Sequence, residues 1–218
     1  MNIPNNYQLI YRDIKHARIR VSEDGKVRVL IPSSFTDADT EALLKKKERW
    51  INQKIGFFAG KSKIHLNRNQ LLLLGNRYTY SYLPKCTRRV ILDNKHHMIS
   101  TSKDMLDAIV QEKWYKYYAK DYLALRVSEL SCKLNFSFNK LYIRSQRTKL
   151  GNCSDKKNIS LNWRLIKAPA LVIDYIIVHE LVHTKVMNHT NSFWTLLKSH
   201  YPDYKSAIEW LDKYGNSL

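Results

Sequence analysis

Hydrophobic and polar residues alternate at the start of the chain. The alternation runs from Tyr7 to Val21 and resumes from Val27 to Ile31, and residues 23–26 between them contain the Asp-Gly pair of a tight turn. Because successive side chains of a strand point to opposite faces, this pattern predicts a β-hairpin with one buried face. Pro32 marks its end.

A helix is expected after this hairpin. Thr36 and Asp39 have the spacing of a capping box, in which two side chains satisfy backbone amides at a helix N-terminus. The helix is predicted to reach about Ile55, with Trp50 among its inward-facing residues and Lys45 to Lys47 in solvent. Residues 56–69 have the character of a linker.

The middle of the chain contains two further hairpin patterns and one long helical pattern. Apolar runs at 71–74 and 78–82 flank Gly75-Asn76, and shorter runs at 90–92 and 98–99 flank Asp93-Asn94. From about residue 103 to 130, apolar positions recur with the 3.6-residue period of an amphipathic helix.

The C-terminal part is mostly helical. Strands are expected at 141–143 and 159–161 around a loop, and Pro169 precedes a strongly apolar helix over about 171–187. Two short helices, at 191–200 and 204–214, follow. Strands early and helices late indicate an α+β fold with an antiparallel sheet. We therefore expect two regions, a β-rich portion with one helix at 1–103 and a helical portion at 104–218.

The charge of the chain is strongly positive and unevenly distributed. The formal net charge is +18, and residues 1–63 carry 13 basic against 7 acidic side chains, whereas residues 151–218 carry 8 against 6. Such a balance favours polyanionic partners, so the basic N-terminal half is expected to bind nucleic acid. Lys45 to Lys47, Arg88 and Arg89 are the candidate phosphate contacts.

The sequence also predicts the environment of the chain. No apolar run is long enough to span a bilayer, so a membrane partner is not expected. The three cysteines, Cys86, Cys132 and Cys153, are odd in number and lack paired spacing, which favours a reducing cytoplasm over a disulfide framework. The sequence does not set an oligomeric state.

The chemically most informative segment is an HExxH motif on the predicted apolar helix. His179 and His183 are four residues apart, so they share one helix face and can bind one metal ion. Glu180 lies beside that face, where it can accept a proton from a metal-bound water. Imidazole ligands and hydrolytic chemistry favour Zn²⁺.

A catalytic zinc site needs a third protein ligand, and His189 is the candidate. It follows His183 by six residues, and the chain must turn between them for its ring to return to the ion. Asn188 is expected to make this turn because Asn tolerates the left-handed conformation that ends helices. The alternative is that the two motif histidines are core residues with polar partners.

The motif residues belong to a longer pattern that resembles the YgjP-like metallopeptidase family, which is related to the SprT-like zinc proteins. Further residues match over most of the chain, and the segment from Asp174 to Trp194 is the most specific part. Two positions depart from the family, which has Trp and Ser where this chain has Leu150 and Asn152. The matching residues are Gly25, Pro32, Trp50, Ile51, Gly151, Cys153, Ser154, Ile159, Leu161, Asn162, Pro169, Asp174, Tyr175, His179, Glu180, Leu181, His183, Asn188, His189, Phe193, Trp194 and Pro202.

Two functions follow from these observations. The first is a zinc metallopeptidase that hydrolyses a peptide or protein substrate, with Glu180 as general base, and the resemblance implies a zincin-like helical core for it. The second is a basic nucleic-acid-associated protein in which the zinc is structural. The motif favours the peptidase, because a structural site has no need of Glu180 and usually has four protein ligands. Arg147, Lys149 and Tyr175 are candidates for stabilising an oxyanion.

Overall fold

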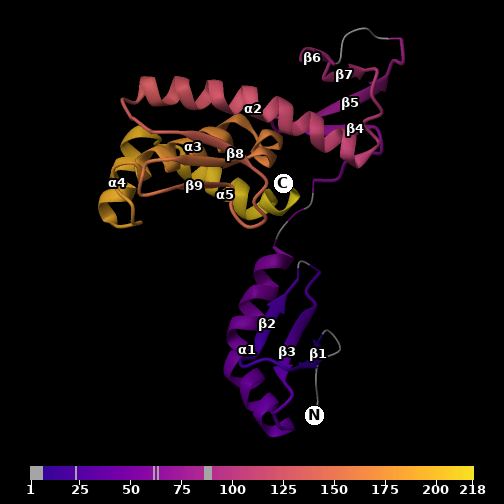
Figure 1. The fold of residues 1–218 in the computed structure, drawn as a ribbon, viewed down its shortest axis with the longest axis vertical. Coiled ribbons are helices and arrows are strands. Elements are labelled where there is room, and N and C mark those ends of the chain that lie inside the picture. Colours follow the sequence, from indigo (N-terminus) through magenta and orange to yellow (C-terminus); the bar gives the residue numbers. More distant parts are fainter. Residues whose placement is uncertain (1–6, 23, 61, 63, 86–89) are drawn as a thin grey trace. The chain divides into compact units, whose positions relative to one another are not determined.

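The computed structural model describes residues 7–22, 24–60, 62, 64–85 and 90–218 of the 218-residue chain. The chain forms two compact units, Met1–Lys63 and Ile64–Leu218. Glu23 of the expected turn, together with Cys86, Arg88 and Arg89, lies outside the described residues. Figure 1 labels the elements of both units and colours them by their position in the sequence.

The first unit is a three-stranded sheet covered on one face by a helix. The capping box at its helix N-terminus is confirmed, because Thr36 Oγ1 accepts a hydrogen bond from the Asp39 amide at 3.2 Å and Asp39 accepts one from the Thr36 amide at 2.9 Å. Trp50 does not face inward as expected, since 41% of it is exposed, while Ile51 is fully buried. The elements are β1 (Tyr7–Arg12), β2 (Arg18–Val21), β3 (Val27–Pro32) and α1 (Asp37–Ala59).

The second unit contains two sheets and the remaining helices. One sheet has the strand order β4-β5-β7-β6, and the other has the order β8-β10-β9. Its strands are β4 (Gln70–Leu73), β5 (Asn76–Tyr82), β6 (Ile91–Asp93), β7 (Met98–Thr101), β8 (Leu141–Arg144), β9 (Gly151–Cys153) and β10 (Ile159–Asn162). Its helices are α2 (Ala108–Lys133), α3 (Ala170–His183), α4 (Asn191–His200) and α5 (Tyr204–Tyr214), with short 3₁₀ turns η1 (Trp163–Lys167) and η2 (Gly215–Ser217).

The α+β class is confirmed, but the sheets are mixed rather than purely antiparallel. The same arrangement occurs in three groups of strands, which are β1 to β3, β5 to β7 and β8 to β10. In each group the last strand in sequence lies in the centre, antiparallel to the second strand and parallel to the first. The last two strands form a hairpin, and the first strand adds to the free edge of the hairpin's second strand. Parallel pairing follows from that order.

Several elements differ from those expected. The segment from Tyr7 to Val21 forms two strands, β1 and β2, instead of one arm of a hairpin, and α1 reaches Ala59 instead of about Ile55. Helix α2 begins at Ala108 rather than near 103, because the Asp107 side chain accepts hydrogen bonds from the Ile109 and Val110 amides. The loop over 144–158 contains the additional strand β9. Helix α3 ends at His183 instead of near 187, with Thr184 as its C-cap residue.

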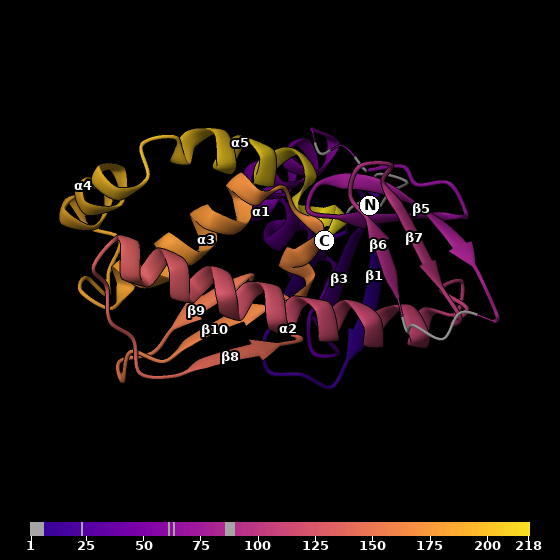
Figure 2. The ribbon, with the colours of Figure 1, turned by 90° about the horizontal axis from the view of Figure 1, so that it is seen from above.

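One core joins the sheet of β4 to β7 with the helices of the second unit. Tyr115 of α2 is buried, and its hydroxyl donates to the Leu72 carbonyl of β4 at 2.7 Å. The division expected between residues 103 and 104 therefore falls inside this unit. Helix α3 packs against α2, α4, α5, β9 and β10. Figure 2 shows it between helices α4 and α5 on one side and the sheet of β8 to β10 on the other. None of the described helices combines the length and apolar character needed to cross a membrane.

Candidate metal centre

Helix α3 is apolar around almost its whole circumference, which is the pattern of a helix inside a core. Its last turn carries His179, Glu180 and His183, of which Glu180 is 5% and His183 8% exposed. Burying an ionisable side chain costs free energy unless polar partners compensate for it. Side chains at such positions therefore indicate either compensating partners or a function.

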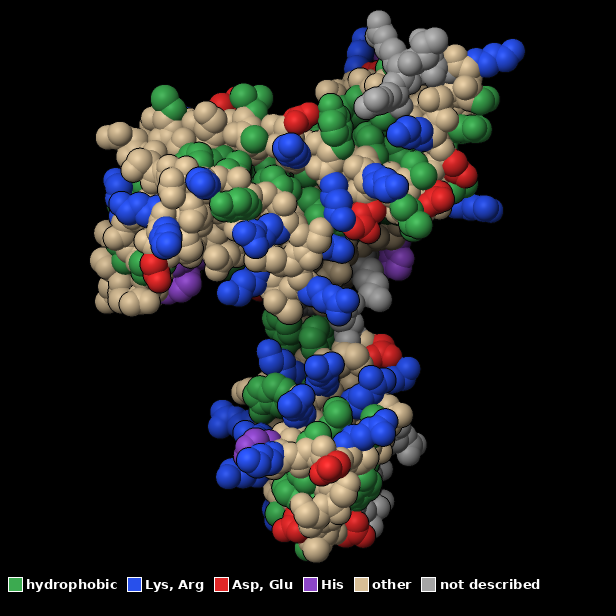
Figure 3. All heavy atoms as spheres, viewed as in Figure 1, with side chains coloured by type: hydrophobic (Ala, Val, Ile, Leu, Met, Phe, Trp, Pro, Cys, Tyr) green, Lys and Arg blue, Asp and Glu red, His purple; other side chains and the backbone are tan. Residues whose placement is uncertain are grey.

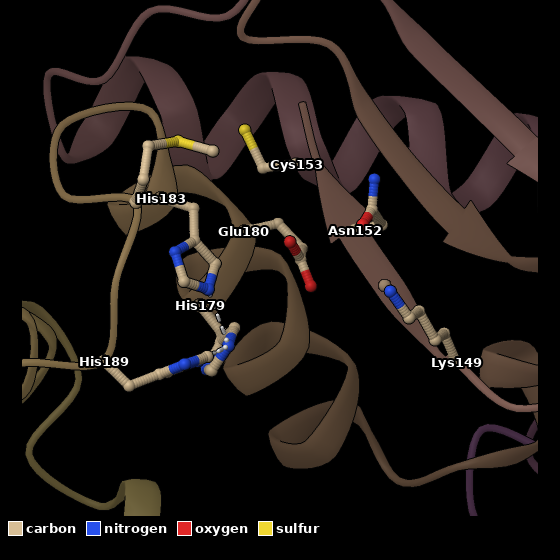
Figure 4. A pocket seen from close by; sticks show the side chains of 9 residues that line it. Lys149, Asn152, Cys153, His179, Glu180, His183 and His189 are labelled. Atoms are coloured by element: carbon tan, nitrogen blue, oxygen red, sulfur yellow. Dashed lines mark hydrogen bonds between the residues drawn. The ribbon is translucent and has the colours of Figure 1, made fainter. Parts of the chain in front are cut away.

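The two motif histidines meet as their spacing predicts, and His189 joins them. His179 Nε2 lies 3.1 Å from His183 Nε2 and 3.1 Å from His189 Nε2. The three rings form a group whose ligand atoms all lie within 4.8 Å of one another. Figure 4 shows the imidazoles converging from the end of α3 and from the loop that follows it.

The turn that returns His189 is not made as expected. Asn188 has no left-handed backbone, because the described non-glycine residues with positive φ are Leu74, His97, Asn135 and Lys157. Instead, α3 ends directly after His183, and the chain turns through hydrogen bonds from Val186 N to Val182 O and from Thr190 N to Asn188 O, both local. The early end of the helix leaves enough chain for His189 to fold back.

Phe193 of α4 packs against all three imidazoles. Its ring centroid lies 4.9 Å from that of His179, 4.6 Å from that of His183 and 4.7 Å from that of His189, and the side chain is fully buried. The sequence marks Phe193 only through the family pattern, since an apolar residue on a short helix carries no chemical signal. Its packing holds the rings in their convergent arrangement.

The nitrogen atoms suit a tetrahedral zinc ion. His183 Nδ1 lies 3.0 Å from the Val186 carbonyl, and donation to that oxygen leaves Nε2 with a free lone pair. Zinc binds imidazole nitrogen at about 2.0–2.1 Å, so two such ligands lie about 3.4 Å apart, close to the observed separations. Three nitrogen ligands would leave a fourth position open, as in catalytic rather than structural sites.

Glu180 faces the same space without a partner of its own. Its Oε2 atom is buried and makes no hydrogen bond within the described part of the chain. Burial raises the pKa of this carboxyl to about 8, against a smaller opposing effect of the Lys149 charge. Burial, with the neighbouring His183 and His189, lowers the pKa of His179 to about 3, so its ring is neutral and available as a ligand.

Strand β9 forms the opposite side of the site. Gly151 is so close to Glu180 that an added Cβ would overlap the carboxylate Oε1 and lie 2.8 Å from its Cγ. Asn152 and Cys153 line the same cavity, of about 290 Å³, together with Lys149 and the three histidines. Burial raises the pKa of the Cys153 thiol to about 11, so this group is not an activated nucleophile.

The side chain of Asn162 fixes the segment that brings Lys149 to the cavity. Its Nδ2 donates to the Gln146 carbonyl at 2.7 Å and to the Lys149 carbonyl at 3.0 Å, and the residue is 2% exposed. Of the three oxyanion candidates, Lys149 lines the cavity and Arg147 is not among its lining residues. Tyr175 packs edge-on against the His179 ring, with 5.8 Å between centroids.

Comparisons with known proteins give a family match and two partial structural similarities. Two solved structures are similar to part of the chain. The metallopeptidase zymogen of Pyrococcus abyssi abylysin is 20% identical over 42% of this chain and 97% of that chain, with a TM-score of 0.36. The metallopeptidase zymogen of Methanocaldococcus jannaschii jannalysin is 26% identical over 40% of this chain and 93% of that chain, with a TM-score of 0.34. A search of curated proteins gives no match. The family model described as YgjP-like, metallopeptidase domain, matches residues 15–214. The chain therefore belongs to the YgjP-like metallopeptidase family.

Proposed function

We propose that this metallopeptidase uses zinc, held by His179, His183 and His189, and that Glu180 is the general base for hydrolysis of a peptide bond. The observation that carries the proposal is the convergence of three imidazole Nε2 atoms beside a buried carboxylate that has an unpartnered oxygen. When bound, zinc would act as a Lewis acid on the substrate carbonyl and lower the pKa of water in the site to about 7.

Glu180 would take a proton from the attacking water and later pass it to the leaving amine. Its environment suits this role, because a carboxylate with a raised pKa is a stronger base than an exposed one. Gly151 keeps the necessary space open, since any side chain at this position would displace the carboxylate. Lys149, across the cavity, would stabilise negative charge that develops on the substrate oxygen.

Strand β9 supports a peptide or protein as the substrate. Among the described strands it pairs only with β10, so its other edge leaves backbone N–H and C=O groups free of sheet partners. An extended peptide can add to such an edge by main-chain hydrogen bonds. Because Gly151, Asn152 and Cys153 of this strand also line the cavity, a peptide bound there would pass the histidine cluster.

A structural zinc site is less well supported. Such sites usually have four protein ligands, and the cluster within the described ranges contains only three histidines. A structural role would also leave the buried Glu180 without a purpose. We also propose that the chain works in a reducing, cytoplasmic compartment. The described cysteines, Cys132 and Cys153, are free thiols, which supports this.

Elemental analysis of the purified protein tests the ligand set. The wild type should contain about one zinc per chain, and His183→Ala should lose tight binding because two ligands cannot hold the ion. His65→Ala, at an exposed histidine outside the cluster, is the matched control and should retain zinc. A wild-type protein without zinc, whose melting temperature does not rise when zinc is added, would refute the proposal.

A further inference from the structure

The sheet of the first unit has one face that α1 does not cover. Its covered face carries Val27, Val29 and Ile31, which pack with Ile51 of the helix. Alternate residues point to the opposite side. We call this second side the open face, and it consists of Gln8, Ile10, Arg12, Arg18, Arg20, Arg28 and Leu30.

Strand register gathers the arginines of the open face. Arg20 of β2 lies directly opposite Arg28 of β3, and Gln8 of β1 flanks Arg28 on the other side. The Arg28 Nε donates to Gln8 Oε1 at 3.2 Å, which orients that guanidinium. Arg18 occupies the next row along the same strand, opposite Leu30. Arg18, Arg20 and Arg28 are all exposed.

No carboxylate balances these charges within the sheet. The three strands contain four arginines and no Asp or Glu, and among the described residues the first unit has one salt bridge, from Lys26 to Asp24 in the turn. Like charges directly opposite in an antiparallel pair are destabilising. The Arg20–Arg28 pair therefore costs the free protein some stability, which an external anion would recover.

The lysines of α1 provide a contrast. Lys45, Lys46 and Lys47 are exposed, but Glu41 precedes Lys45 by four residues and Glu48 follows it by three. Side chains at these spacings are neighbours on a helix surface, so the carboxylates weaken the positive potential there. Figure 3 shows many Lys and Arg side chains over the first unit, with fewer acidic side chains among them. The sheet, not the helix, carries unbalanced positive charge.

We propose that the open face of the β1–β3–β2 sheet is a nucleic-acid binding surface, with Arg18, Arg20 and Arg28 contacting backbone phosphates. The planar guanidinium bonds a phosphate through two parallel N–H groups, which makes arginine well suited to this partner. A hollow of about 840 Å³ at one end of the sheet is lined by Arg20, by Arg28 and by the ion pair of Lys26 with Asp24, so two arginines can approach one phosphate there.

The side chains between the arginines argue against a membrane as the partner. A membrane-binding surface inserts protruding apolar groups into the lipid boundary. On the open face the apolar residues Ile10 and Leu30 are half-buried, whereas the arginines around them are exposed. The cations therefore project beyond the apolar groups, as contact with a charged backbone requires.

Fluorescence anisotropy of the full chain with labelled single-stranded and duplex oligonucleotides tests the surface. For Arg18→Gln/Arg20→Gln/Arg28→Gln we expect at least a tenfold weaker affinity at about 50 mM salt. The slope of log affinity against log salt should fall by about 2 for the single strand, since each phosphate contact contributes about 0.7. The matched control, Lys45→Gln/Lys46→Gln/Lys47→Gln, removes the same charge and should lose less than about threefold.

Further measurements separate the alternatives. The triple arginine variant should keep its zinc and melt no lower than the wild type. Arg20→Gln alone, which relieves the pair repulsion, should fold and still weaken binding. Equal losses in the arginine and lysine variants would overturn the proposal, as would a wild type that binds neither oligonucleotide at low salt. Phosphatidylserine vesicles or polyglutamate bound as tightly as oligonucleotides, through the same arginines, would replace it with a membrane or an acidic protein partner.

Discussion

Among the described residues, the core of the first unit contains four buried hydrophobic side chains, Val27, Val29, Ile31 and Ile51, whereas the continuous core of the second unit contains 30. The larger core surrounds α3 and can hold desolvated groups such as Glu180 at fixed positions. The smaller core supports a sheet whose other face carries arginines that form no salt bridge among the described residues. Burial accordingly sets the electrostatic environment of Glu180 in the second unit, whereas exposed charge sets the surface potential of the first.

The largest expected effect concerns Glu180. Glu180→Gln keeps the size of the side chain but cannot accept a proton, so hydrolysis of an unfolded protein such as casein should fall roughly 10²- to 10⁴-fold. Zinc content and oligonucleotide affinity should not change, because the histidines and the first unit are untouched. Equal turnover by the two proteins would show that Glu180 is not the base.

The difference between the cores is tested by a cavity in the smaller one. Ile51→Ala removes a fully buried side chain from a core of four residues, and such changes cost about 2–5 kcal/mol. Hydrogen exchange should show that β1 to β3 and α1 open more often while α3 stays protected. Loss of protection throughout both units would mean that they unfold together, contrary to the division we describe.

A smaller catalytic effect is expected from the strand that faces Glu180. In Gly151→Ala the new methyl group would overlap the carboxylate, and a misplacement of about 1 Å can reduce a rate about 100-fold. Zinc content should remain, so the defect lies in turnover. Gly56→Ala in α1 is the control, because its Cβ meets nothing within 4 Å, and it should stabilise the helix by up to about 1 kcal/mol. Undiminished turnover in Gly151→Ala would show that the carboxylate does not need this space.

The smallest effect concerns the start of α1. Hydrogen bonds from the Thr36 side chain and amide hold the pKa of Asp39 below its usual range. Because the folded pKa is the lower one, this stabilisation is present above the unfolded value of about 3.9 and is lost as the pH falls through the folded pKa. The protection factors of the first α1 amides, which correct for the intrinsic pH dependence of exchange, should therefore fall on acidification in the wild type and change less in Asp39→Asn. Identical pH profiles would exclude the capping box as the cause.

Local patterns in the sequence account for much of this structure. Hydrophobic periods predicted the helices and most of the strands, since a period of two or of 3.6 residues reflects which face is buried. The capping box predicted the start of α1, and the spacing of His179 and His183 predicted that they share a face. Each of these features depends on residues within a few positions of one another, so a linear pattern contains them.

The remaining features depend on contacts between distant segments. Strand β9 has too little hydrophobic alternation to be recognised, and its closeness to Glu180 follows only from its pairing with β10. The return of His189 required α3 to end early, and the packing of Phe193 on three imidazoles required α4 to fold against α3. The open face arose from register, which pairs Arg20 with Arg28, whereas the sequence favoured the lysines of α1. Burial and register are properties of the assembled chain, so the tertiary structure alone determined the state of Glu180 and the position of the unbalanced charge.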